Sequence, residues 1–118
     1  MDELIPNHVH KATVLDVHDG DTFHCMVRLD FFVRVEIDVR IHLYSAPELN
    51  QDGGVIAREK LKELVDGKEV ILNSVYQTSP TKIQEEGTRS FARWVCDVEV
   101  DSVNVANYMT TNAPTGGN

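Results

Sequence analysis

The longest alternating segment of the chain is FFVRVEIDVRIHLY, residues 31–44. Apolar side chains take every second position, and polar or charged side chains stand between them. This period of two is typical of a β-strand with one face in the core. A strand this long predicts curvature, with the two halves shared between opposite sides of a small β-barrel. The face expected to point inward is Phe31, Val33, Val35, Ile37, Val39, Ile41 and Leu43.

Shorter patterns on both sides of this segment predict four more strands. Two precede it, at residues 8–18 and 22–29, and the dipeptide Asp19-Gly20 between them is a strong turn signal. Two more follow, at residues 68–76 and 89–100, with apolar side chains again at alternate positions. Five strands in total are therefore expected.

Two helices are expected among these strands. Residues 55–65 carry an apolar stripe at helical spacing, and Asp66-Gly67 is a plausible end for that helix. A second, short helix is expected to begin near Ser102, which would act as its cap. One helix before the fourth strand and another after the fifth predict an α+β β-barrel with five strands, of the oligonucleotide-binding (OB) type.

Length and charge limit the classes of function. The chain has 118 residues, enough for one core, so we expect a single domain over residues 1–112 and a disordered tail over residues 113–118. The formal net charge is −8, whereas proteins that grip long nucleic acids by the backbone usually carry a basic face. Any contact with phosphate must therefore use a local arginine cluster or a bound metal ion.

The sequence gives no sign of a membrane segment or a secretory signal. No apolar run approaches the ~20 residues that a membrane-spanning helix needs. The first residues, Met1 to Pro6, lack the basic start and long apolar stretch of a signal peptide. We therefore expect a cytoplasmic protein without a membrane partner.

The apolar faces of the predicted strands hold the two cysteines and the one tryptophan. Cys25 and Cys96 are expected to be buried free thiols. A disulfide between them stays open, because the sequence does not give the distance that joins them. Trp94 is expected to pack in the core, and Arg89 and Arg93 to lie on the outer face of the same strand.

Several polar motifs follow one another in a characteristic order. They are Asp19-Gly20-Asp21-Thr22, Arg40 to Glu48, Ala57 to Leu61, Gly67 to Val70, Gly87-Thr88-Arg89 with Ala92, and Val103-Asn104. Each motif alone has an ordinary interpretation, such as a hairpin turn, a solvated loop acid or a cross-strand ion pair. In this order and spacing, over most of the chain, they resemble the staphylococcal nuclease (thermonuclease-like) family, with a hairpin like that of its small phage and bacterial members.

The resemblance implies a fold, an activity and a cofactor. The fold is the five-stranded OB barrel of the staphylococcal-nuclease type, here without the last helix of the family. The activity is that of an endonuclease, a phosphodiesterase that hydrolyses single-stranded or unwound DNA or RNA by in-line attack of an activated water. The cofactor is Ca²⁺, or Mg²⁺ or another divalent cation, for which oxygen ligands are suited.

The resemblance also assigns residues to the metal. Asp21 matches the first metal carboxylate, and Ala46 matches a position that offers its backbone carbonyl. Asp19 would hold the metal-bound water or a ligand of the metal in place without contacting the metal itself. The second metal carboxylate of the family is replaced by Ser45, whose hydroxyl would bind weakly or through a water, so a lower metal affinity is expected.

The catalytic residues follow from the same resemblance. Glu48 matches the residue that orients or deprotonates the attacking water. Arg40 and Arg89 match two arginines that bind the phosphate and stabilise charge in the transition state. For the first of these positions His42 remains an alternative to Arg40, because both stand on the same face of the predicted strand.

A second function stays open beside the nuclease. The loss of a carboxylate at Ser45 and the acidic net charge also fit a catalytically impaired nuclease-like domain that binds nucleic acid or protein. A protein partner is then expected over the barrel flank that the missing helix leaves uncovered.

Overall fold

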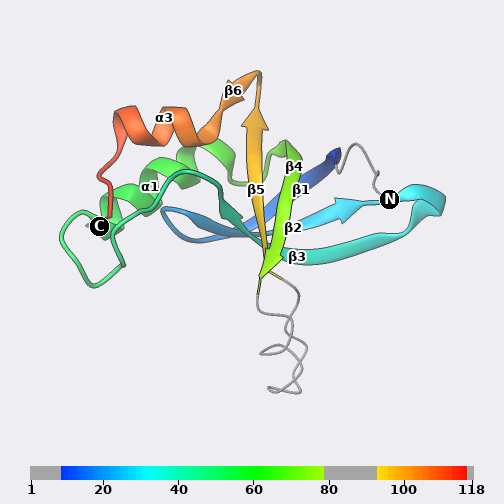
Figure 1. The fold of residues 1–118 in the computed structure, drawn as a ribbon, viewed down its shortest axis with the longest axis horizontal. Coiled ribbons are helices and arrows are strands. Elements are labelled where there is room, and N and C mark those ends of the chain that lie inside the picture. Colours follow the sequence, from blue (N-terminus) through cyan, green and yellow to red (C-terminus); the bar gives the residue numbers. More distant parts are fainter. Residues whose placement is uncertain (1–8, 79–92, 117–118) are drawn as a thin grey trace, which may run out of the picture.

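The computed structural model describes residues 9–78 and 93–116, and it forms a closed five-stranded mixed β-barrel with two α-helices (Figure 1). The barrel strands are β1 (Val9–Asp19), β2 (Thr22–Arg28), β3 (Arg34–Ile41), β4 (Glu69–Thr78) and β5 (Arg93–Val100). The other elements are the 3₁₀ turn η1 (Asp30–Phe32), α1 (Gly54–Val65), the short strand β6 (Val103–Asn104) and α3 (Val105–Asn112). The predicted α+β barrel is confirmed at this level.

The barrel closes through one parallel pair of strands. Antiparallel pairing runs in the order β3-β2-β1-β4-β5, and β3 then pairs with β5 in parallel, from Asp38 opposite Arg93 to Ile41 opposite Cys96. With this last pairing each of the five barrel strands has a neighbour on both sides, which closes the ring of strands. β6 adds only a short extension to β5.

Bulges supply the curvature that closure needs. β1 pairs with β2 along one part and with β4 along another, and its register with β2 shifts between Val14 and Asp16 and again between Val17 and Asp19. β4 and β5 have a further shift between Ser74 and Tyr76. Bulges of this kind bend a strand and increase its twist. β1 is thus a bent strand shared between two parts of the barrel, and the end of β3 is likewise shared, between β2 and β5.

The predicted inward face of that segment is correct only in its middle. Ile37, Val39 and Ile41 pack in or against the core, whereas Phe31 is 91% exposed and Leu43 is 80% exposed. Val33 and Val35 are exposed as well. The strand is interrupted by η1, and β3 begins only at Arg34, so this part of the hairpin extends past the barrel, where no other layer of described residues covers it. After Ile41 the chain leaves the sheet, and Leu43 has a φ of 70° that takes it out of the strand.

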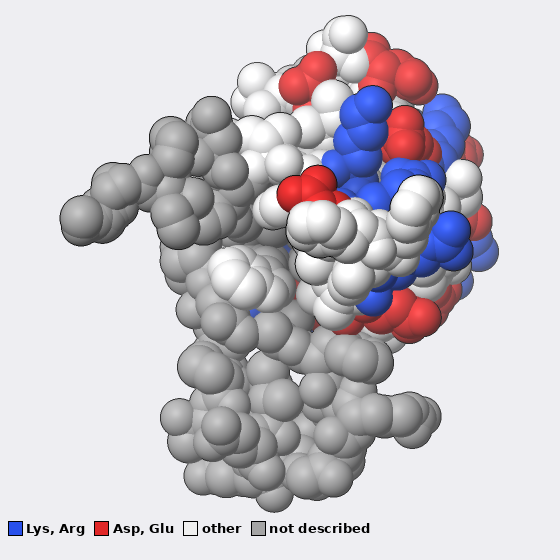
Figure 2. All heavy atoms as spheres, turned by 90° about the vertical axis from the view of Figure 1, so that its right-hand side faces the viewer, with Lys and Arg blue, Asp and Glu red and all other residues white. Residues whose placement is uncertain are grey.

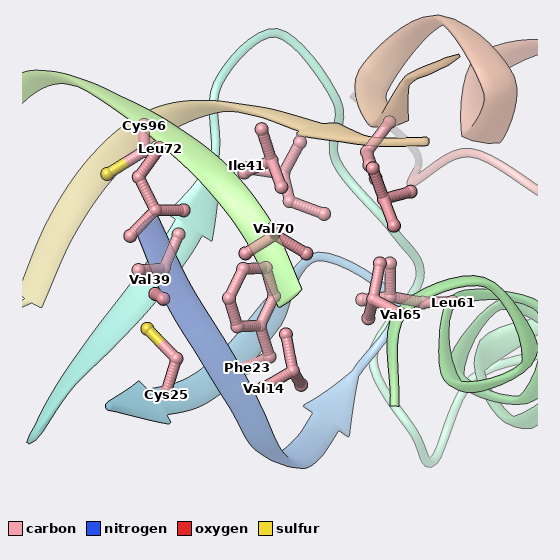
Figure 3. Close-up of a cluster of buried hydrophobic side chains, with 14 of the residues drawn as sticks. Val14, Phe23, Cys25, Val39, Ile41, Leu61, Val65, Val70, Leu72 and Cys96 are labelled. Carbon is pink, nitrogen blue, oxygen red and sulfur yellow. The ribbon is translucent and has the colours of Figure 1, made fainter. Parts of the chain in front are cut away.

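The core fills the barrel and one of its ends (Figure 3). Leu61 and Val65 of α1 lie at one end of this core, and Cys25, Cys96 and Leu72 lie toward the other. Both cysteines are buried and free, as predicted. Burial raises the pKa of each thiol to about 12, so both stay protonated and unreactive near neutral pH.

The C-terminal elements begin slightly later than predicted. α3 starts at Val105, and its cap is Asn104, whose side-chain oxygen accepts a hydrogen bond of 2.9 Å from the amide of Asn107. Ser102 instead has a φ of 67° in the turn between β5 and β6. No helix among the described residues is long and apolar enough to cross a membrane.

A histidine bound on both sides by carboxylates joins β2 to β3 on the outer face of the barrel. His24 Nδ1 lies 2.8 Å from Asp38 Oδ1, and His24 Nε2 lies 2.8 Å from Glu36 Oε1. Only the imidazolium form can donate from both nitrogens. Burial by itself lowers the pKa of His24, but the hydrogen bonds and negative charges of Glu36 and Asp38 outweigh it, and the net pKa is raised.

A raised pKa in the folded state makes the contribution of His24 to stability depend on pH. The contribution is complete below the unfolded pKa of about 6.5 and is lost as pH rises through the higher folded pKa. His24→Gln should therefore destabilise the protein more at about pH 5.5 than at about pH 9, as measured by urea denaturation. His18→Gln is the matched control, because His18 Nε2 lies 4.0 Å from Asp38 and its side chain is half exposed. An equal pH dependence in both variants would contradict the specific role of His24.

Candidate functional site

The residues of the predicted site gather around one polar cavity of about 520 Å³. It lies where the β1–β2 turn, the end of β3, the start of β5 and the loop after β3 meet. Its lining residues are His18, Asp19, Asp21, Thr22, Asp38, Arg40, Ala46, Glu48 and Arg93. Five residues assigned from the sequence are thus brought together: Asp19, Asp21, Arg40, Ala46 and Glu48. Arg89 lies outside the described residues.

Close packing under the β1–β2 turn fixes the position of its carboxylates. Gly20 is buried, and a Cβ atom placed on it would lie 2.6 Å from the Cβ atoms of both Ala46 and Ala57. No side chain fits in that space, so the glycine is required by the approach of the loop and of α1. The turn is thereby held against both elements.

Asp21 links this turn to the loop and to β3. Its side chain is almost fully buried, and Oδ2 accepts a hydrogen bond of 3.0 Å from the amide of Ala46. Oδ1 accepts one of 2.9 Å from the hydroxyl of Thr22, and the guanidinium of Arg40 lies 3.7 Å from Oδ2. The backbone carbonyl of Asp21 accepts from the amide of Ile41 at 2.9 Å. Asp21 is therefore both a charge facing the cavity and a structural junction.

Asp19 is a second carboxylate beside the first. Its Oδ1 accepts a hydrogen bond of 3.1 Å from the amide of Asp21. Burial raises the pKa of Asp19, and the side chain and negative charge of Asp21 raise it further, against the lowering effect of that backbone hydrogen bond. Two crowded carboxylates of this kind become easier to ionise together when a cation lies between them.

Arg40 and Arg93 reach the cavity from neighbouring strands. Arg40 is near the end of β3 and donates a hydrogen bond of 2.9 Å to the hydroxyl of Ser45. Arg93 begins β5, where the parallel pairing places it opposite Asp38. The sequence predicted Arg93 only as an outward residue, and its place on this cavity became visible only through the β3–β5 pairing. His42 hydrogen-bonds through Nδ1 to Asp97 at 3.0 Å, so Arg40 is the residue of this pair that lines the cavity.

Glu48 lies on an ordered turn at the rim. Its amide donates to Oε1 of Gln51 at 3.0 Å, and its carbonyl accepts from the amide of Gln51 at 2.8 Å. A Cβ on Gly54 would overlap the Glu48 carbonyl, so this glycine lets α1 begin directly against the turn. The carboxylate itself is on an exposed residue, where it can meet water.

The described residues of the cavity supply few side-chain ligands for a metal ion. Among them, no group of three or more His, Cys, Asp and Glu side chains is arranged to hold a metal ion. The hydroxyl of Ser45 accepts a hydrogen bond from the guanidinium of Arg40. The groups available to a cation at this site are the neighbouring carboxylates of Asp19 and Asp21. Such a pair suits a largely hydrated ion that takes its other ligands from water and from a phosphate, as Mg²⁺ commonly does.

The excess of negative charge in the cavity also favours the binding of a cation. Four carboxylates, from Asp19, Asp21, Asp38 and Glu48, line it with two guanidiniums. An anionic phosphodiester entering such a site is repelled by the excess of negative charge unless a cation offsets it.

The first residues of the predicted tail lie against the loop that carries the site. Tyr44 is buried and its hydroxyl donates a hydrogen bond of 2.5 Å to the carbonyl of Pro114. The amide of Gly116 donates to the carbonyl of Ser45 at 2.6 Å, and Pro114 approaches Gly53. The described part of the predicted tail, residues 113–116, thus contacts the site loop through Pro114 and Gly116. Burial, with a smaller effect from the charge of Asp21, raises the pKa of Tyr44 to about 12.

Comparison of the chain with models of protein families and with curated protein sequences found no match. The assignment of a function therefore depends on the geometry of the cavity.

Removing the hydroxyl of Tyr44 should release residues 113–116 from the site loop. Tyr44→Phe should lower the free energy of unfolding by about 1 kcal/mol, because one partly buried hydrogen bond is lost. Hydrogen exchange at the amide of Gly116 should accelerate at the same time. Tyr108→Phe on α3 is the matched control and should leave that exchange rate unchanged. An unaltered Gly116 amide in Tyr44→Phe would show that the tyrosine does not hold the segment.

Proposed function

We propose that the chain is a metal-assisted phosphodiesterase that cleaves nucleic acid at the cavity between the β1–β2 turn and the start of β5. The observation that carries the proposal is the joint placement of two guanidiniums, from Arg40 and Arg93, with the carboxylates of Asp21 and Glu48 on one cavity. Guanidinium groups bind phosphate oxygens in a forked geometry, and a nearby carboxylate can take the proton of an attacking water. We further propose that the barrel is of the OB type found in staphylococcal nuclease.

Each residue has a distinct part in the proposed reaction. Asp21 and Asp19 would hold the divalent cation, Ca²⁺ or Mg²⁺, which neutralises charge on the phosphate when it is bound. Arg40 and Arg93 bind the phosphate oxygens and stabilise the added negative charge of the transition state. Glu48 accepts a proton from the attacking water. That water approaches phosphorus from the side opposite the leaving oxygen.

Arg93 takes the position in this proposal that the sequence gave to Arg89. Arg93 lines the cavity at the start of β5, and the parallel pairing sets it next to Asp38, two residues before Arg40 on β3. Arg40, near the end of β3, lines the same cavity. Two donors on adjacent strands can contact different oxygens of one phosphate.

The substrate that fits the charge of the protein is an accessible strand. With a net charge of −8, the chain lacks the broad basic surface needed to hold a duplex by its backbone. Single-stranded or unwound DNA or RNA can instead bring one phosphate at a time to the cavity.

Cleavage assays with matched variants test the proposed function. The wild-type chain should cleave a single-stranded oligonucleotide at alkaline pH when Mg²⁺ or Ca²⁺ is supplied. Glu48→Gln and Arg93→Ala should each lower kcat by roughly 10²-fold or more, because they remove the base and a transition-state donor. Glu59→Gln, an exposed glutamate on α1, is the control and should keep wild-type activity. A folded wild-type chain without cleavage under either metal would refute the proposal.

A binding module without catalysis is the second candidate. The observation that favours it is the hydrogen bond from Arg40 to Ser45, because a neutral hydroxyl stands where the resemblance places a metal carboxylate. A partner in that case is a nucleic acid or a protein.

Ser45→Asp distinguishes the two candidates. The variant should bind Mg²⁺ or Ca²⁺ at least ~10-fold more tightly by calorimetric titration, since it adds a negative charge close to Asp21. Ser45→Asn is the control, because it has the shape of aspartate without the charge. Cleavage by Ser45→Asp alone would identify the wild type as the binding module, whereas cleavage by both would support the enzyme.

A further inference from the structure

The far end of the β2–β3 hairpin presents an apolar tip to solvent. We define the tip as Leu29, Phe31, Phe32, Val33 and Val35. Phe32 is 100% exposed and Phe31 is 91% exposed, and the three aliphatic members are between 38% and 50% exposed. Single exposed apolar residues are common on protein surfaces, but a contiguous group that includes two bare aromatic rings marks an interaction surface.

The figures show where this surface lies. The hairpin projects from the barrel on the side away from α1 and α3 (Figure 1). Figure 2 views the molecule from that side, where uncharged surface lies next to charged side chains of both signs. The tip is also distant from the candidate site, because the site includes Thr22 at the start of β2 and the tip follows Arg28 at its end.

The backbone holds the two rings outward. Phe31 has a φ of 64° and Phe32 a φ of 63°, the left-handed region that bulky side chains rarely adopt. Two hydrogen bonds close the turn. The amide of Leu29 donates to the carbonyl of Val33, and the amide of Val33 donates to the carbonyl of Asp30. Strain of this kind persists where function needs it, and within one chain the exposed rings bring no packing in return.

An apolar hollow opens at the mouth of the barrel beside the hairpin. Its volume is about 210 Å³, and its lining includes His10, Val27, Leu29, Val35, Leu72 and Trp94. The other end of the core is closed by Leu61 and Val65 of α1 (Figure 3). A dry cavity of about 150 Å³ is enough to bind benzene, so this hollow can accept a phenyl ring.

We propose that two copies of the chain form a symmetric dimer in which one phenylalanine of each hairpin tip enters the barrel mouth of the other copy and the second phenylalanine packs against the apolar rim of that mouth. The ring and the hollow lie on one continuous surface, because Leu29 and Val35 belong to both. A surface that carries both a projection and its complement can pair with itself across a two-fold axis, so that each contact occurs twice.

The available area is consistent with a weak specific dimer. Four phenylalanine rings would bury roughly 600 Å², and the surfaces that receive them a similar area. The total approaches the ~1,200 Å² at the lower end of specific interfaces. A second copy also accounts for the hollow, which a lipid surface would leave unfilled, and the acidic net charge of the chain disfavours anionic membranes.

Sedimentation equilibrium of the full chain tests the dimer. Over concentrations from ~1 to ~300 µM, the mean mass should rise from one chain toward two, as expected for a small interface. Phe31→Ser with Phe32→Ser should raise the dissociation constant at least ~30-fold, because the rings are the central anchors. Leu43→Ser is the matched control, since Leu43 is also exposed and has a φ of 70°, but lies outside the tip.

Two further measurements make the result specific to the barrel mouth. Trp94 is the one tryptophan and lines the hollow, so its emission should shift to shorter wavelength with the same concentration midpoint as the mass. Val35→Arg should block the mouth and abolish the dimer of that variant. An equimolar mixture of Val35→Arg with the double serine variant should restore some dimer, because one ring–mouth contact is then complete.

Three outcomes would overturn the proposal. They are a mass of one chain at every concentration, a dimer that the double serine variant leaves unchanged, and binding of the monomer to phosphatidylcholine vesicles through the tip. The cleavage assay is independent of all three, because neither phenylalanine belongs to the candidate site.

Discussion

The parallel pairing of β3 with β5 is the constraint on which the rest of the structure depends. Antiparallel pairing alone would leave an open sheet with β3 at one edge and β5, extended by the two-residue β6, at the other. Their pairing closes the barrel, encloses the core and sets Arg93 beside Asp38, two residues before Arg40. Closure of the barrel and assembly of the candidate site therefore depend on the same pairing. A chain that failed to pair β3 with β5 would lose the closed barrel and the site together.

Within the closed barrel, the site depends on how tightly a turn and a loop approach each other. Gly20 lets Ala46 and Ala57 come close, and Asp21 then binds the amide of Ala46 from a nearly buried position. Burial and mutual repulsion raise the pKa of the neighbouring Asp19. Negative charge concentrated in this way, with Arg40 and Arg93 on the same cavity, is the arrangement on which the proposed binding of a cation and a phosphate rests.

The β2–β3 hairpin differs in character along its length. Near Thr22 and Arg40 it contributes polar side chains to a cavity, and in the middle His24 binds Glu36 and Asp38 across the two strands. At its turn, between Arg28 and Arg34, the hairpin extends past the barrel and exposes apolar side chains to solvent. One long hairpin thus places a proposed catalytic site and a proposed association surface at separate ends, so that either can be altered without the other.

The sequence by itself determined the period-two strands, the α1 helix and the buried cysteines, because these depend on local pattern. The expectation that Asp21, Arg40 and Glu48 belong to one site came from a resemblance to a family, and the structure places all three on one cavity. Only the tertiary structure decided the rest. Alternation shows that two faces differ, but not whether a second layer covers either of them, so the exposure of Phe31 could not be read from it. Arg93 joined the site through a pairing between distant strands, which no local pattern records.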